Sequence, residues 1–208
     1  DYVGCDVQRG LGYSYNADAI DDDGCNGATA IGANPPAIGV DFFEGPYQDN
    51  DGIDNPLTTD ISLAKAQLGI PYKGLGIGYG DGVIDNERFG MKRFVYYDGQ
   101  LPQNSFGDPQ TAVEYYNYMR GYWRDNTRFV YGASGNSSST GATTIPTDYC
   151  FPGNSDPYNW GTLGIDPGFD WSEIAPGNGL PSNIIGDRRF VQAAGPFTLA
   201  PGALNNIT

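Results

Sequence analysis

The sequence predicts a mostly β fold, loop-rich and β-sandwich-like, with one substantial α-helix near residues 109–124. Glycine and proline contribute 31 and 15 of the 208 residues, which is typical of short strands joined by well-defined loops. Aromatic residues make up 13% of the chain, more than disordered chains contain. The chain is long enough to bury a core without cross-links. No internal repeat or linker is visible, so we expect a single domain over residues 1–208.

The expected strands are short runs of aromatic and β-branched residues. They lie within residues 1–16, after the rigid Pro35-Pro36 turn, and at 92–97, 187–191 and 195–199. Between them, glycine occupies every second position from Gly74 to Gly82. In a strand, this spacing would leave one face as bare backbone that another layer could approach closely. A loop is an equal alternative for this segment.

One segment carries the signals of a helix. Asp108 is a favoured N-cap and Pro109 is favoured at the first helical position. Apolar residues then recur at helical spacing, which predicts one face packed on the core. These residues are Val113, Tyr116, Met119, Tyr122 and Trp123, and we expect the helix to end near 124–126.

The charge balance excludes several function classes. The net charge is −14, from 25 acidic and 11 basic residues. Nucleic acid is therefore not an expected partner, because phosphate binding needs clustered Lys and Arg. We also expect no membrane insertion, because no apolar stretch could cross a bilayer. The absence of His excludes a Ser-His-Asp or Cys-His nucleophile and removes the usual zinc ligand.

Short acidic turns built on Asp-Gly are the most specific motifs. Residues 21–24 and 49–52 both have the pattern Asp-x-Asp-Gly, and 81–87 repeats Asp-Gly with two further acids. Oxygen ligands two residues apart, followed by a glycine, suit a hard cation such as Ca²⁺. Neither later loop is an EF-hand, because its first and twelfth positions would carry no acid. Ordinary turns are the alternative.

We predict at least one Ca²⁺ ion held by ligands from two of these loops, together with backbone carbonyls and water. Bound cations would also relieve the self-repulsion of so acidic a chain. The preferred ligands are Asp49, Asp51, Asp54, Asp81 and Asp85, with Asp21 and Asp23 as second choice.

Three cysteines are present without a Cys-x-x-Cys motif, which makes a zinc or redox site an unfavoured interpretation. In an oxidising compartment, we expect Cys5 and Cys25 to pair and close a loop that carries the first acidic cluster. The odd count leaves at least one thiol unpaired within the chain.

Aromatic residues in the long loops are candidate sugar platforms. Tyr158, Trp160 and Trp171 could stack on glycans, which makes a glycan-binding module the main alternative function. A glycoside hydrolase based on two carboxylates is the one enzyme class considered, since it needs no His. Its conceivable acids are Glu44, Glu114, Glu173 and Asp187. We assign no catalytic residue, because such aromatic rings also serve to fix loops to a core.

Several strings in the chain resemble a known group of proteins. They are residues 34–37 and 41–46, Asp85-Asn86-Glu87-Arg88-Phe89-Gly90-Met91, residues 115–121, Gly186-Asp187-Arg188-Arg189-Phe190 and residues 194–202. They resemble large secreted cell-surface proteins of Bacteroidota-type bacteria, which often end in a type IX secretion sorting domain and have no assigned activity. The sorting domain is not in this sequence. The resemblance implies export, an extracellular or cell-surface location, and a longer parent chain that is processed.

These observations predict an extracellular, calcium-stabilised surface protein with a structural, adhesive or filament-forming role and no catalytic activity. Cations would tie the acidic loops together and make them rigid. We expect residues 197–208 to form a terminal strand that pairs with a neighbouring copy of the chain.

Overall fold

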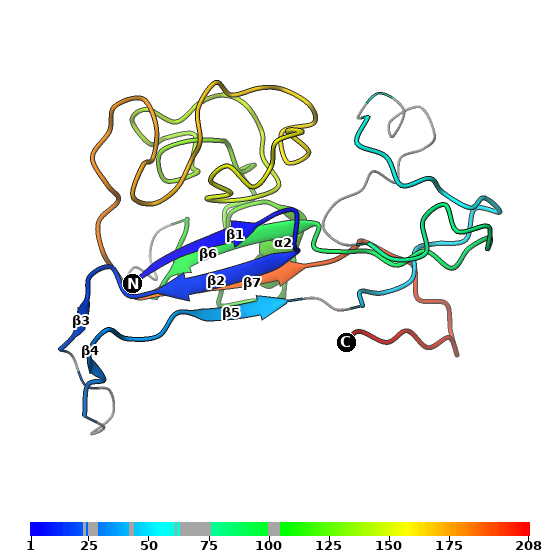
Figure 1. The fold of residues 1–208 in the computed structure, drawn as a ribbon, viewed down its shortest axis with the longest axis horizontal. Coiled ribbons are helices and arrows are strands. Elements are labelled where there is room, and N and C mark those ends of the chain that lie inside the picture. Colours follow the sequence, from blue (N-terminus) through cyan, green and yellow to red (C-terminus); the bar gives the residue numbers. More distant parts are fainter. Residues whose placement is uncertain (23, 25–28, 42–43, 61, 63–75, 100–104) are drawn as a thin grey trace.

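The computed structural model describes residues 1–22, 24, 29–41, 44–60, 62, 76–99 and 105–208. Within these residues, short strands and the short helix α2 are connected by long loops (Figure 1). The elements are β1 (Tyr2–Asp6), β2 (Leu11–Tyr15), β3 (Ile20–Asp21), β4 (Gly32–Ala33), β5 (Ile38–Asp41), β6 (Arg93–Asp98), α2 (Ala112–Arg120) and β7 (Arg188–Ala193). The prediction of a mostly β, loop-rich chain is therefore confirmed.

All the strand pairs are antiparallel in the part of the chain that the structure describes. Strands β1, β2 and β5 form one sheet, in which Gly12 pairs with both Cys5 and Val40. Strands β6 and β7 pair over their full length, and β3 pairs with β4. The expected strands at 92–97 and 187–191 thus pair with each other. The strand expected at 195–199 is absent, because the chain leaves the sheet after Ala193.

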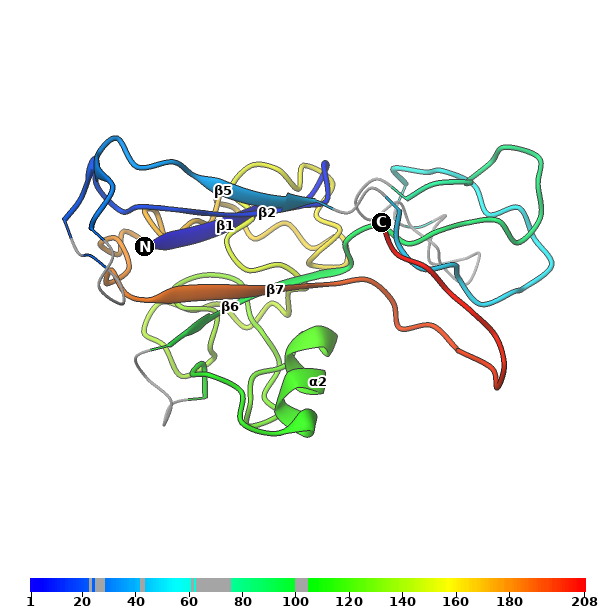
Figure 2. The same cartoon turned by 90° about the horizontal axis from the view of Figure 1, so that it is seen from below.

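The β6–β7 pair occupies the middle of the molecule. In Figure 2 it lies between the three-stranded sheet and helix α2, and β7 contacts β1, β2 and α2. A Cβ atom built at Gly12 would come within 2.8 Å of the Phe94 ring, so glycine allows the sheets to approach closely there. Gln192 of β7 donates through Nε2 to the Val40 carbonyl at 3.0 Å and links the two sheets.

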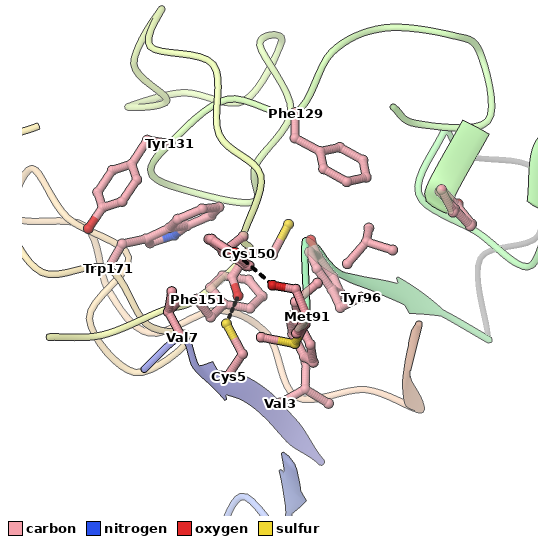
Figure 3. Packing of buried hydrophobic residues seen from close by; sticks show 14 of the residues in the cluster. Val3, Cys5, Val7, Met91, Tyr96, Phe129, Tyr131, Cys150, Phe151 and Trp171 are labelled. Carbon is pink, nitrogen blue, oxygen red and sulfur yellow. Dashed lines mark hydrogen bonds between the residues drawn. The ribbon is translucent and has the colours of Figure 1, made fainter. Parts of the chain in front are cut away.

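Aromatic side chains from the loops after α2 fill much of the core (Figure 3). The Trp123 ring lies 4.6 Å from Phe129, and the Trp171 ring lies 4.9 Å from Phe151, measured between centroids. Both indole nitrogens donate to loop carbonyls, Trp123 to Gly135 at 3.0 Å and Trp171 to Ala133 at 2.9 Å. These loops are held by their aromatic residues, because each ring buries a large apolar area and fixes the backbone with its N–H group.

Helix α2 is shorter than predicted and buries a different face. Thr111 is the N-cap, and it forms a reciprocal capping box with Glu114 that Asp108 cannot form. The helix ends at Gly121, which adopts the left-handed conformation with φ 86°. Nine residues are helical, and within them Asn117 and Tyr118 are buried.

The predicted apolar face of the helix is therefore wrong. Val113, Tyr116 and Met119 are 68%, 52% and 43% exposed, respectively. Tyr118 instead stacks on Tyr97 of β6 at 5.7 Å and donates to the Gly107 carbonyl at 2.6 Å. Trp123 is buried, but it lies beyond the end of the helix. The chain after Gly121 is a loop, so helical spacing does not predict which of its side chains are buried.

The cysteine prediction is not supported by the structure. Cys5 and Cys150 are free and buried, and the Cys5 thiol donates to the Cys150 carbonyl at 3.5 Å. Burial raises the pKa of the Cys150 thiol to about 12 and raises that of Cys5 well above its ordinary range. Cys25, the partner predicted for Cys5, lies outside the described residues. The correction follows from the position of Cys5 on β1, where its side chain points into the core (Figure 3).

None of the helices in the described part of the chain combines the length and the apolar character needed to cross a membrane.

Replacing Trp171 with alanine should lower the free energy of unfolding by about 3–5 kcal/mol. The substitution creates a large cavity and leaves the buried Ala133 carbonyl without its donor. Urea denaturation followed by fluorescence measures the loss. Tyr158→Ala is the control, because its exposed ring should cost less than about 0.5 kcal/mol. Equal losses in the two variants would contradict a core held by Trp171.

Candidate functional site

Two acidic loops lie side by side at one end of the molecule. Tyr47 forms an antiparallel bridge with Arg88, and the Gln48 amide donates to the Glu87 carbonyl at 3.0 Å. Arg88 pairs with Ile77 on its other side. We call residues 47–55 and 76–88 the acidic clasp. Figures 1 and 2 show both segments next to the C-terminal residues, beyond the ends of β5 and β7.

Carboxylates of the clasp hold the two loops reciprocally. Asp85 Oδ1 accepts from the backbone N–H groups of Asp51 at 2.8 Å and Gly52 at 3.0 Å. In the opposite direction, the two oxygens of Asp54 accept from Gly80 at 2.8 Å and Gly82 at 2.7 Å. A carboxylate from each loop thus accepts the hydrogen bonds of backbone N–H groups in the turn of the other loop. Hydrogen bonds to an ionised acceptor are stronger than neutral ones, so the pairing is well suited to fixing two loops that have no sheet ladder.

Two other carboxylates of the clasp act locally. Asp51 accepts from Ile53 N at 2.9 Å and from Asn55 Nδ2 at 3.1 Å. Asp81 accepts from Asn86 Nδ2 at 2.9 Å and Val83 N at 2.8 Å. The hydrogen bond from Asn86, followed by that from Val83, lowers the pKa of Asp81. Both residues form the Asp turns that the Asp-Gly pattern indicates.

The remaining predicted ligand of the clasp, Asp49, binds the C-terminal segment. Its carboxylate accepts from the Thr198 backbone amide and from Thr198 Oγ1 at 2.7 Å. These two hydrogen bonds lower the pKa of Asp49. At the end of the segment, the Thr208 and Glu44 backbones exchange two hydrogen bonds, of 2.8 and 3.0 Å. Residues 197–208 therefore run along the clasp without forming the predicted strand.

The predicted metal ligands are brought together only in part. Asp49, Asp51, Asp54, Asp81 and Asp85 all belong to the clasp, but every one of them accepts hydrogen bonds from N–H groups. Across the described residues, no three Asp, Glu or Cys side chains form a group suited to a metal ion. Asp21 lies apart on β3 and accepts from Ile31 N at 2.9 Å, and Asp23 lies outside the described residues. Calcium binding stays a prediction.

Sequence reasoning missed a buried ionic network that joins three strands. Glu173 is fully buried, and it accepts from Arg188 Nε at 2.8 Å and from Val3 N at 2.7 Å. Arg188 also pairs with Asp98 of β6. Burial raises the pKa of Glu173 even though Arg188 opposes the shift. The network connects β1, β6 and β7. No motif around Glu173 marks this residue in the sequence.

The predicted sugar platforms are mostly inaccessible. Trp160 and Trp171 are 2% and 0% exposed, so neither indole face can stack on a glycan, and this part of the prediction is wrong. Both rings are buried because removing so large an apolar surface from water stabilises the folded chain. Tyr158 alone of the three is exposed. Near it, a polar crevice of about 470 Å³ is lined by Tyr131 and Phe169 together with Asn154, Asn159, Asp166 and Asp170.

The comparisons with known proteins give no match: no family model, no curated protein and no solved structure is similar to the chain. The resemblance to secreted Bacteroidota-type proteins therefore stays a prediction.

Replacing Asp54 with asparagine should lower the free energy of unfolding by about 1.5–3 kcal/mol, the range for hydrogen bonds to charged groups. The side-chain amide would present N–H to Gly80 or Gly82, where an acceptor is needed. Thermal and urea unfolding measure the loss, with Asp22→Asn as a control that removes one exposed charge outside the clasp. If both variants matched the native chain, the carboxylate of Asp54 would not hold the loop.

Proposed function

We propose that the chain is a non-catalytic, calcium-stabilised structural module of an extracellular surface protein, in which the two sheets pack as a small β-sandwich. The reciprocal clasp is the observation that carries this proposal. Carboxylates that would serve a catalytic or ligand site in another protein are used here to hold loops, as Asp54 and Asp85 do. Such an arrangement suits a structural module, because hydrogen bonds hold the two loops to each other and they are not free to close over a substrate.

The conceivable glycosidase acids support a structural role, because each has an arginine partner. Glu44 lies 3.4 Å from Arg88, Glu114 lies 3.3 Å from Arg124, and Asp187 lies 2.9 Å from Arg189. Glu173 is enclosed by Arg188 and Val3. A retaining or inverting pair needs two carboxyl groups that face a sugar from opposite sides. These acids are distributed over four separate arginine contacts instead.

Calcium would add to the clasp rather than create it. Asp85 uses Oδ1 for two amides, while its Oδ2 takes no hydrogen bond within the described residues. A cation on free oxygens of this kind would offset part of the net charge of −14. Its binding free energy would appear as folding free energy, because the unfolded chain does not hold the loops together.

An adhesive or filament-forming role is supported by the C-terminal segment. Leu199, Leu204 and Ile207 are 58%, 96% and 57% exposed, although Thr198 and Asn205 of the same segment are hydrogen-bonded to the clasp. A rigid segment that presents apolar side chains loses little entropy when it docks. We propose that this surface contacts a neighbouring copy of the chain.

A glycan-binding module is the second candidate, favoured by the polar crevice next to Tyr158. The crevice combines the Phe169 ring with amide and carboxylate groups that could bind sugar hydroxyls. On a glycan array, a genuine binder should lose its signal when Asp170 is replaced with alanine, whereas Asp125→Ala, an exposed acid after α2, should leave it unchanged. Equal signals from both variants, or none from the native chain, would remove this candidate.

Adding Ca²⁺ to chain stripped with EGTA should raise the melting temperature by about 5 °C or more at a hundredfold excess over Kd. Magnesium at the same concentration should have a much smaller effect, because it prefers rigid octahedral sites. Differential scanning calorimetry measures the shift, and sedimentation velocity on the same samples tests self-association. An identical melting temperature with and without Ca²⁺ would remove calcium from the proposed function and leave the hydrogen-bonded clasp alone.

A further inference from the structure

Helix α2 carries an apolar face that its own molecule leaves exposed. Val113, Tyr116 and Met119 follow one another at three-residue spacing, so they occupy neighbouring positions on one side of the helix. All three are exposed. Tyr118 lies on the buried side and holds the helix against β6 through its stack on Tyr97. Figure 2 shows α2 on the outer side of the β6–β7 pair, where its exposed face can meet another molecule.

The exposed face of the helix borders a groove of about 380 Å³. Tyr116, Met119 and Arg120 line its helix side. Residues 192–197, where the chain leaves β7, and Ile207 line the other side. Most of these side chains are aliphatic or aromatic, and Ile207 belongs to the C-terminal segment whose exposed apolar residues are described above. Exposed apolar surface of this kind marks sites of protein interaction.

Arginine side chains give this face a positive charge. Arg120 is exposed, and its guanidinium donates to two asparagine side chains rather than to an acid. Arg93 donates to the Arg120 carbonyl at 3.3 Å, and Arg128 donates to the next carbonyl along the chain. Both of these arginines pair with Asp148, which is buried. Three arginines therefore gather at the end of α2 around one buried carboxylate, on a chain whose net charge is −14.

The tip of the acidic clasp, residues 51–54 and 80–85, has the complementary chemistry. Hydrogen bonds of Asp54 and Asp85 hold its two segments side by side. Its exposed side chains include three aliphatic residues and two acids: Ile53, Val83, Ile84, Asp51 and Asp81. The tip thus combines apolar side chains with negative charge, whereas the groove combines apolar side chains with positive charge.

From this complementarity we infer that the groove beside α2 binds the clasp tip of a second copy of the chain. The two surfaces lie at different places on one molecule (Figure 2), so the contact is heterologous and builds a ring or an open filament. Opposite charges steer the encounter and fix its orientation, while apolar burial stabilises the contact. The inference rests on the proposed contact between neighbouring copies and names the two surfaces that meet in it.

Charge reversal on either surface tests the inference. Arg120→Glu should raise the dissociation constant for self-association by about tenfold or more, because the new carboxylate would face the acidic tip. Arg9→Glu is the matched control, since it makes the same change in net charge at an exposed arginine outside both surfaces. Ile84→Arg should weaken association in the same way, whereas Ile174→Arg, at a similarly exposed position outside both surfaces, should not. Sedimentation velocity over a concentration series measures the constants, and circular dichroism verifies that each variant is folded.

A mixture of the two variants gives the decisive readout. When Arg120→Glu and Ile84→Arg chains are mixed, each altered groove can meet an oppositely charged tip and each native groove a native tip, so association should return. Recovery in the mixture, with both controls unchanged, would support the contact. Association that neither variant weakens, or that mixing does not restore, would overturn the inference, while a contact between copies through other surfaces would stand.

A native chain that stays monomeric at every concentration would overturn both this inference and the proposed contact between copies. The groove would then serve a different partner. Calcium stabilisation would be unaffected by that result, because it is measured on the melting temperature of the single chain.

Discussion

The structure depends on carboxylates that accept hydrogen bonds from the backbone N–H groups of loops. In a sheet, the carbonyl groups of a neighbouring strand would accept these bonds. Much of the described chain lies outside sheets and helices, and its N–H groups still need acceptors wherever water is excluded. Aspartate supplies them at many points. Asp54 binds Gly80 and Gly82, and Asp156 binds the amides of Trp160 and Gly161, both at 2.8 Å. The acidic composition therefore has a structural role in this loop-rich fold.

So many carboxylates repel one another, and arginines pair with those that are most deeply buried. Arg188 lies between Glu173 and Asp98, and Asp148 is shared by Arg93 and Arg128. These contacts join strands to loops, and removing one partner would leave a buried charge without compensation. In the clasp, the described partners of Asp54 and Asp85 are backbone N–H groups.

Two parts of the molecule are stabilised by different interactions: buried aromatic rings in one, and hydrogen bonds to carboxylates in the other. Around β6 and β7, rings such as Trp123 and Trp171 hold the loops by apolar contact and by indole hydrogen bonds. In the clasp, polar contacts dominate, and Ile53, Val83 and Ile84 are exposed. Hydrogen bonds to ionised groups depend on pH, salt and bound ions far more than apolar burial does. The clasp is consequently the part of the protein through which its surroundings can change its stability.

The sequence by itself determined the β-rich class, the positions of β6 and β7, and the Asp turns at Asp51 and Asp81, because these follow from local residue pattern and turn chemistry. It also indicated which two acidic loops belong together. Tertiary structure decided which carboxylate holds which loop, since Asp54 and Gly80 are 26 residues apart and no local rule pairs them. It also decided that Trp160 and Trp171 are buried and that Val113 is exposed. Burial depends on what packs against a side chain, and spacing along the chain does not specify that partner when most of the core is built from loops.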